Sequence, residues 1–265
     1  MSAAVEISAL TRRFGDRIAV DGLSVAVQQR TIFGLLGTNG AGKSTTIRML
    51  ITLLAPTSGS AQVAGFDIVT APRAVRAHIG YVPQMLSADG ELTGRENLLI
   101  SAKLYGIARE ERRQRIHDAL EFMALTSFAD TLTSRYSGGM IRRLEIAQAM
   151  LHRPAVLFLD EPTVGLDPVA RHAVWERIRS LRFDYGTTIV MTTHDMDEAD
   201  HLCDAVGFMH LGRLITVGTP GALKAQLGPG ATLDDVFVRY TGPGIAERGD
   251  YRDVARARRT AERLE

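Results

Sequence analysis

A glycine-rich segment between two apolar segments constrains this 265-residue chain more than any other feature. The segment covers residues 37–45 and has the sequence Gly-Thr-Asn-Gly-Ala-Gly-Lys-Ser-Thr. Residues 31–36 before it have the length and composition of a buried strand, and residues 46–50 after it have the apolar spacing of a helix. A strand, a glycine-rich turn and a helix in this order are typical of a phosphate-binding loop.

The residue types of the segment suit a triphosphate and its metal ion. Glycines let the backbone wrap closely and turn successive N–H groups inward, and a helix that begins near Lys43 adds unpaired N–H groups. Lys43 would reach the β- and γ-phosphates, and the Ser44 hydroxyl would bind Mg²⁺. The alternative is a glycine-rich turn that binds nothing. The residues predicted to contact the nucleotide here are Gly37, Thr38, Asn39, Gly40, Ala41, Gly42, Lys43, Ser44 and Thr45.

Length and composition allow one large α/β domain, or an α/β core with a helical insert. The chain has 31 Lys and Arg against 30 Asp and Glu, so its formal net charge is +1. This balance gives no support to a general nucleic-acid or membrane-surface binder. One cysteine excludes an internal disulfide, and no apolar run approaches the roughly 20 residues that span a bilayer. We therefore expect a cytoplasmic protein, with any membrane-spanning part supplied by another chain.

Two later apolar runs end in side chains that can do chemistry. Residues 155–159 are typical of a central parallel strand and end at Asp160 and Glu161. Asp160 can hold Mg²⁺, directly or through water, and Glu161 can accept a proton from an attacking water. The run 187–192 leads to His194, which we expect at the γ-phosphate, although a lone histidine is more often structural. Two solvent-facing acids in a loop are the alternative for the pair.

Gln84 follows a predicted strand at residues 79–82. The carboxyl ends of parallel strands meet at one edge of a sheet, where open α/β sheets bind ligands. We place Gln84 with Glu161 and His194 in the catalytic group, and with Ser44 and Asp160 in the Mg²⁺ site. Taken alone, Gln84 could equally be an exposed loop residue.

Residues 85–152 change to a helical pattern and predict an inserted helical subdomain. Thr93 and Glu96 form a possible capping box, and residues 109–115 are a charge run typical of a solvated helix face. The last helix begins at Ser137, Gly138 and Gly139. Ser137 is a good N-cap, and the glycines leave N–H groups uncovered at a positive helix end. The segment is therefore a candidate second anion site, or simply a capped helix.

The residues before the glycine-rich segment predict β structure. Residues 5–8 alternate as in an edge strand, residues 11–15 are turn-like, and residues 23–27 alternate again. Phe14 lies where an aromatic ring could stack on adenine, although aromatic residues are also common in cores.

These motifs, in this order and together with Asp167, resemble the ATPase subunit of ABC transporters. The resemblance covers roughly residues 5–218. The segments Leu-Thr-Gly-Arg-Glu-Asn-Leu, Tyr-Ser-Gly-Gly-Met and Gly-Leu-Asp-Pro are most similar to antibiotic-resistance exporters of the daunorubicin-resistance type. Such subunits pair with a separate permease of the ABC-2 type.

The resemblance implies an α/β fold: a P-loop NTPase core with a mainly parallel sheet, an N-terminal antiparallel β subdomain and the helical subdomain at about 85–152. The ATPase domain would cover residues 1–241. Residues 242–265 would form a helical or disordered tail.

The resemblance also implies a mechanism that uses two copies of the chain. They would face head to tail, with each ATP between one phosphate loop and the Ser137–Gly139 segment of the other copy. Phe14 would stack on adenine, Asp167 would bridge the two copies, and Gln84 would link the nucleotide to the permease. The assembly would lie on the inner face of the membrane, export a drug or other amphipathic compound, and bind no nucleic acid.

Two departures and two alternatives stay open. Tyr136 and Met140 replace the Leu and Gln of the usual Leu-Ser-Gly-Gly-Gln signature, which leaves the rate of turnover uncertain.

One alternative is a non-transport ABC ATPase acting on ribosomes or DNA. Such proteins usually carry two halves in one chain or long coiled coils. The other is a small-molecule kinase or GTPase, for which the base-reading Asn-Lys-x-Asp motif is missing.

Overall fold

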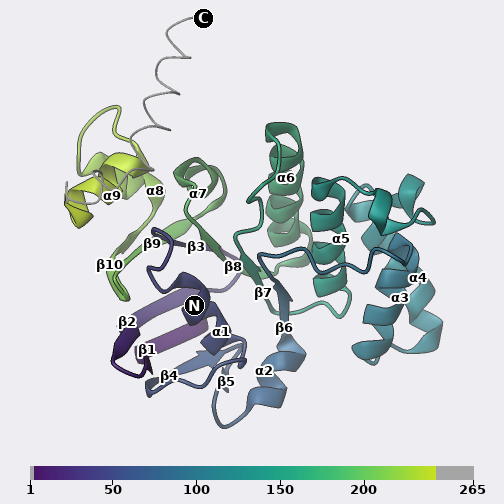
Figure 1. Cartoon of the computed structure of the whole chain (residues 1–265), viewed down its shortest axis with the longest axis horizontal. Coiled ribbons are helices and arrows are strands. Elements are labelled where there is room, and N and C mark those ends of the chain that lie inside the picture. Colours follow the sequence, from purple (N-terminus) through teal and green to yellow (C-terminus); the bar gives the residue numbers. More distant parts are fainter. Residues whose placement is uncertain (1–2, 243–265) are drawn as a thin grey trace, which may run out of the picture.

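The computed structural model describes residues 3–242 and contains two β-sheets with helices packed around them (Figure 1). The larger sheet has six strands in the order β10-β9-β3-β8-β7-β6. All neighbours are parallel except β9 and β10. The strands are β3 (Ile32–Leu36), β6 (Ile79–Val82), β7 (Val156–Asp160), β8 (Thr188–Thr193), β9 (Ala205–His210) and β10 (Arg213–Gly218).

The central strands explain where the functional side chains lie. Every residue of β3, β7 and β8 is buried, as expected for parallel strands covered on both faces. Because these strands are parallel neighbours, their carboxyl ends share one edge of the sheet. The glycine-rich loop, the pair Asp160–Glu161 and His194 all follow these ends.

The smaller sheet is antiparallel, in the order β2-β1-β4-β5. Its strands are β1 (Ala3–Phe14), β2 (Arg17–Gln28), β4 (Ser58–Val63) and β5 (Phe66–Asp67). This sheet and the larger one share a hydrophobic cluster with α1 (Lys43–Leu50), which contributes Ile47, Met49 and Leu50.

The structure of β1 differs from two predictions made from the sequence. β1 pairs with both β2 and β4, so residues 5–8 lie inside the sheet and do not form an edge. Residues 11–14 continue β1, and only Gly15 and Asp16 form the turn, since Phe14 pairs with Arg17. The reason is that the outer half of this hairpin is largely exposed and lacks the alternation that marks residues 5–8.

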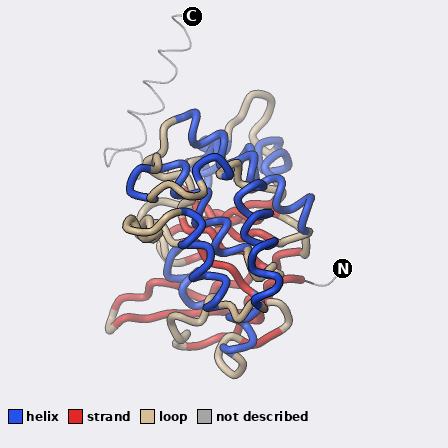
Figure 2. The backbone as a smooth tube through the Cα atoms, turned by 90° about the vertical axis from the view of Figure 1, so that its right-hand side faces the viewer, coloured by secondary structure: helices blue, strands red, loops and turns tan. Residues whose placement is uncertain are grey.

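The helical region contains α3 (Gly94–Leu104), α4 (Arg109–Phe122) and α5 (Gly138–Met150), and follows α2 (Pro72–His78) and β6. The capping box of Thr93 and Glu96 is confirmed. α5 packs against both α3 and α6 (Pro168–Tyr185), so that α6 stands between α7 and this region (Figure 1). Figure 2, seen from this side, shows these helices in front of the strands.

The C-terminal part adds α7 (Met196–Leu202), the β9–β10 hairpin, α8 (Pro220–Ala225) and α9 (Leu233–Thr241). Thr232 and Asp235 form a capping box at the start of α9. Leu233, Val236 and Phe237 bury its apolar face. The predicted tail, residues 242–265, lies outside the described residues except for Gly242.

Within residues 3–242, none of the helices has the length and apolar character required to cross a membrane.

Candidate active site

The glycine-rich loop connects β3 to α1, as its flanking residues predict. Gly37 and Gly42 have φ angles of +154° and +108°, which favour glycine. A Cβ at Gly37 would collide with the Met209 carbonyl oxygen, and one at Gly42 with the Ala19 carbonyl oxygen. The loop is therefore packed tightly against neighbouring backbone, which only glycine permits at these two positions.

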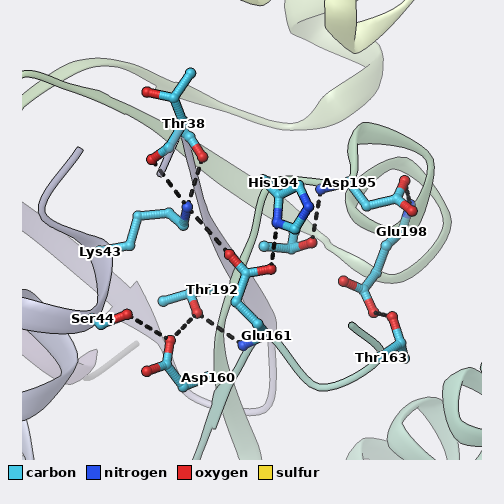
Figure 3. A network of polar contacts seen from close by, with 12 residues as sticks. Thr38, Lys43, Ser44, Asp160, Glu161, Thr163, Thr192, His194, Asp195 and Glu198 are labelled. Atoms are coloured by element: carbon cyan, nitrogen blue, oxygen red, sulfur yellow. Dashed lines mark hydrogen bonds and ion pairs between the residues drawn. The ribbon is translucent and has the colours of Figure 1, made fainter. Parts of the chain in front are cut away.

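Lys43, the first residue of α1, turns back over the loop (Figure 3). Its ammonium group donates to the carbonyl oxygens of Gly37 at 2.7 Å and Thr38 at 3.3 Å. It also lies 3.2 Å from Glu161 Oε1, and both side chains are buried. The cation of the phosphate loop is thus already in contact with the proposed proton acceptor.

Asp160, the last residue of β7, lies beside Ser44 in the first turn of α1 (Figure 3). Asp160 Oδ1 accepts hydrogen bonds from Ser44 Oγ at 3.1 Å and from Thr192 Oγ1 at 2.5 Å. A carboxylate and a hydroxyl are the oxygen ligands that Mg²⁺ prefers. The residues present therefore fit a magnesium ion at this position.

Glu161 is held by backbone and side-chain contacts together. Its φ angle is +51°, in the left-handed region that few non-glycine residues adopt. Its N–H lies 3.0 Å from the Thr192 hydroxyl and 3.1 Å from the Thr192 carbonyl oxygen. Its Oε2 lies 2.7 Å from His194 Nδ1, opposite the contact with Lys43. The carboxylate is thus fixed between two nitrogen groups.

These contacts set the charge of Glu161 and His194. Burial alone would raise the Glu161 pKa, but the hydrogen bond from His194 and the charge of Lys43 outweigh it and hold that pKa below its usual value. The same hydrogen bond from Glu161 raises the His194 pKa. Glu161 is therefore ionised at neutral pH, as a proton acceptor must be.

Three other predicted site residues are held by hydrogen bonds outside this cluster. Gln84 is exposed just after β6, and Arg142 donates to its carbonyl oxygen at 2.7 Å. Ser137 caps α5 by accepting from Met140 N–H, and Asp167 caps α6 by accepting from Ala170 N–H. Among the described residues, none of these three makes a hydrogen bond to the glycine-rich loop.

The start of α5 instead lies against the start of α6. A Cβ at Gly138 would lie 3.2 Å from Leu166 Cδ2, and one at Gly139 would lie 2.7 Å from Ala170 Cβ. Ser137–Gly139 and Asp167 therefore share one surface of the chain. Their proposed contacts with a nucleotide stay predictions.

Phe14 stands next to the turn between β1 and β2 with 46% of its surface exposed. The Arg12 guanidinium carbon lies 4.5 Å from the centre of its ring. The ring is accessible and has a cation on one face. Adenine stacking by Phe14 remains a prediction.

Sequence reasoning missed three polar residues next to the site. Thr192 holds Asp160 and the Glu161 backbone, while Glu198 and Thr163 form a buried hydrogen bond behind them. Thr192 could have been noticed in the sequence as a polar residue near the carboxyl end of a largely apolar strand. The position of Glu198 follows only from the packing of α7 on α6 and β8.

Comparison with known proteins gives a consistent result. Residues 20–164 match the family model described as ABC transporter. The chain is 46% identical over 224 residues to the Nod factor export ATP-binding protein I of Paraburkholderia xenovorans, covering 84% of this chain and 73% of that protein. It is also 46% identical over 225 residues to the daunorubicin/doxorubicin resistance ATP-binding protein DrrA of Streptomyces peucetius, covering 85% and 68%.

Two solved structures are similar in fold. One, the ATP binding subunit of an ABC transporter, has a TM-score of 0.80 and 31% identity over 90% of this chain and all of that one. The other, cbiO1 from Clostridium perfringens, part of the ABC transporter complex cbiONQ, has a TM-score of 0.78 and 28% identity over 86% and 92%. The P-loop NTPase fold is therefore confirmed. With its phosphate loop, paired acids and histidine at one sheet edge, the chain belongs to the ABC transporter family, as an ATP-hydrolysing, ATP-binding subunit.

Proposed function

We propose that this protein hydrolyses ATP between two copies of itself and so drives export through a separate permease of the ABC-2 type. The observation that carries the proposal is the cluster of Lys43, Glu161 and His194 beside Ser44 and Asp160. The relatives reported above are named for export of Nod factor and resistance to daunorubicin, which supports an exporter. They do not favour the alternative of an ATPase acting on ribosomes or DNA.

The chemistry assigned to the chain is the attack of water on the γ-phosphorus. Backbone N–H groups of residues 37–45 and the Lys43 ammonium bind the phosphate oxygens. Glu161 takes a proton from the water as the new O–P bond forms and the bond to the β-phosphate oxygen breaks. His194 holds the carboxylate in place. Ser44 and Asp160, with Gln84, would hold Mg²⁺, which supplies positive charge to the phosphate oxygens when it is bound.

Lys43 contacts both the loop and Glu161. The phosphate oxygens of a bound nucleotide would compete with Glu161 for the Lys43 ammonium. The Lys43 charge is one of the causes that lower the Glu161 pKa.

A second copy explains the remote anion site. Ser137–Gly139 and Asp167 share one surface but make no hydrogen bond to their own loop within the described residues. In a two-fold symmetric pair, each such surface can face the phosphate loop of the partner. Two ATP molecules would then be gripped by both chains at once, and hydrolysis would release the pair.

The permease is assigned to the surface beside Gln84. Met85 and Leu86 follow it with 81% and 49% of their surfaces exposed, which offers apolar area to a partner. The complex would lie on the cytoplasmic face of the membrane. A drug or other amphipathic compound is the cargo class that the two relatives suggest.

The direct test replaces the proton acceptor. Glu161→Gln should lower the ATPase rate by about 10² to 10⁴-fold, since that is what a general base contributes, while ATP binding persists. Glu176→Gln, at an exposed position on α6, is the matched control and should hydrolyse ATP normally. Near-normal turnover by Glu161→Gln would remove it as the base.

Mixing two inactive variants tests the shared site. Lys43→Ala damages one phosphate loop and Ser137→Arg damages one α5 start, so a mixed pair keeps one intact site if sites form between chains. ATPase activity should appear only in the mixture. Absence of any activity in the mixture would mean either that each site forms within one chain or that both sites of a pair must work together.

A further inference from the structure

A buried carboxyl group lies directly behind the candidate active site. Glu198 is in α7, and only 1% of its surface is exposed. Its Oε1 accepts hydrogen bonds from Thr163 Oγ1 at 2.6 Å and from Trp175 Nε1 at 2.9 Å, and it also bonds the Thr193 hydroxyl. Figure 3 shows Glu198 and Thr163 beside the cluster of Glu161 and His194. The chemistry proposed above does not use Glu198.

A carboxyl group this deeply buried is energetically unfavourable. Burial raises the pKa of Glu198, and the three donors counteract this only in part. An apolar side chain would fill the same volume without that cost. What an apolar residue could not do is join three segments through one polar group.

The segments that Glu198 joins all carry site residues. Thr163 comes two residues after Glu161, and its carbonyl oxygen accepts from Leu166 N–H at 3.2 Å, just before Asp167. Thr193 directly precedes His194. Trp175 belongs to α6, which is capped by Asp167.

A second contact fixes the direction of α7. Asp195 accepts hydrogen bonds from the N–H groups of Asp197 and Glu198, and its other oxygen lies 2.8 Å from Arg171 of α6. The start of α7 is thus tied to α6 independently of Glu198. This keeps Glu198 aimed at Thr163 and Trp175.

We propose that Glu198 is a positioning residue for ATP hydrolysis, which holds Thr163 and Thr193 so that Glu161 and His194 stay in contact and the turn to Asp167 stays against Gly138. The proposal rests on the roles given above to Glu161 and His194. Its physical basis is that small displacements of a catalytic group cost about 10²-fold in rate. We expect nucleotide binding by the phosphate loop to be independent of these contacts, because they join Glu198 to Thr163, Trp175 and Thr193 and not to residues 37–45.

The test compares two substitutions at one position. Glu198→Gln keeps a carbonyl oxygen for Thr163 and Trp175, and its amide can donate to Thr193. Glu198→Leu removes every acceptor. We expect kcat to fall about tenfold or more in Glu198→Leu with the KM for ATP nearly unchanged, and to stay within about threefold of wild type in Glu198→Gln.

Further variants keep the test decisive if Glu198→Leu does not fold. Thr163→Val and Trp175→Phe each remove one donor and should lower kcat without changing the binding of ATP. Thr163→Val in the Glu198→Leu background should lower kcat no further. Thr133→Val is the matched control, since Thr133 is also a buried threonine but donates to carbonyl oxygens in the helical region. It should lower stability and leave kcat unchanged.

The outcomes separate this proposal from the proposed function. If Glu161→Gln hydrolyses ATP normally, the assignment of the site fails. If Glu161→Gln is inactive but Glu198→Leu keeps the wild-type kcat, only the role of Glu198 fails. The role of Glu198 also fails if Glu198→Leu loses ATP affinity in step with kcat, or if Glu198→Gln is as impaired as Glu198→Leu.

Discussion

Glu161 shows how one residue combines backbone geometry and charge. Its left-handed φ angle turns the side chain from the end of β7 toward Lys43 and His194. A non-glycine residue in this conformation costs of order 1–3 kcal/mol, and such strain is frequent at functional sites. The hydrogen bonds that the Glu161 N–H donates to Thr192, together with the contacts of its carboxylate with Lys43 and His194, offset that cost.

The Glu161–His194 contact predicts a pH dependence of stability. The His194 pKa is raised from 6.5, so its contribution is complete below that value and is lost as the pH rises through the raised value. The Glu161 pKa is lowered from 4.5, so its contribution is complete above that value and is lost as the pH falls through the lowered one. The pair therefore stabilises the fold between the two shifted values.

Melting temperatures of wild type and His194→Asn, measured across neutral pH, check this. Wild type should melt higher by the largest margin in mildly acidic buffer, and the margin should shrink in alkaline buffer. His117→Asn, at an exposed histidine of α4, should show no such trend. A margin for His194→Asn that is independent of pH would contradict the ion pair.

Among the helices, the start of α5 is set by its distance from α6. A Cβ at Gly139 would lie 2.7 Å from Ala170 Cβ and 3.5 Å from its Cα, whereas one at Gly138 would meet only the end of the Leu166 side chain at 3.2 Å. Gly139→Ala must therefore push two helices apart, while Gly138→Ala needs only a rotation of Leu166.

We expect Gly139→Ala to lower the free energy of unfolding by about 1–3 kcal/mol, the usual cost of overpacking. Gly138→Ala should cost clearly less. Urea denaturation of the two variants measures the difference. Equal stability of both would mean that α5 and α6 do not pack this closely.

A buried ion pair ties the middle of α5 to the loop that carries Gln84. Arg142 and Glu145 are both 2% exposed and 3.0 Å apart. Arg142 also donates to the carbonyl oxygens of Pro83 and Gln84, and Glu145 accepts from the N–H and hydroxyl of Ser87. These contacts therefore join α5, which Ser137 caps, to the loop that carries Gln84.

Arg142→Met should lower the free energy of unfolding by about 3–5 kcal/mol, because it leaves Glu145 buried without its cation. The control is Arg95→Met, which breaks the exposed pair with Asp130 and should cost less than about 1 kcal/mol. Chemical denaturation checks both. A small loss for Arg142→Met would mean that water reaches Glu145.

Local sequence predicted the parts of the fold that local chemistry decides. The caps at Thr93 and Ser137 lie where their residue types indicated. The cluster of Lys43, Asp160, Glu161 and His194 could be anticipated, because parallel strands bring their carboxyl ends together. The inner position of β1 could not, since β4 pairs with it from about 50 residues away. The contacts of Thr192 and Glu198 depend on strand order and helix packing in the same way.

At the scale of the whole molecule, the two predicted anion-binding elements belong to different parts of the fold. The phosphate loop follows the central strand of the larger sheet, while Ser137–Gly139 and Asp167 share a surface at the ends of α5 and α6. Within residues 3–242, Ser137 and Asp167 make no hydrogen bond to the phosphate loop of the same chain. The proposed mechanism therefore requires a second copy of the chain, in which the phosphate loop of one copy and the Ser137–Gly139 segment of the other contact the same nucleotide.

The most direct measurement is the mass of Glu161→Gln in solution, by light scattering, with Mg²⁺ and saturating ATP. We expect a particle of two chains with ATP, a single chain with ADP, and a single chain with ATP once Ser137→Arg is added. A particle of one chain under all three conditions, with ATP bound, would contradict it.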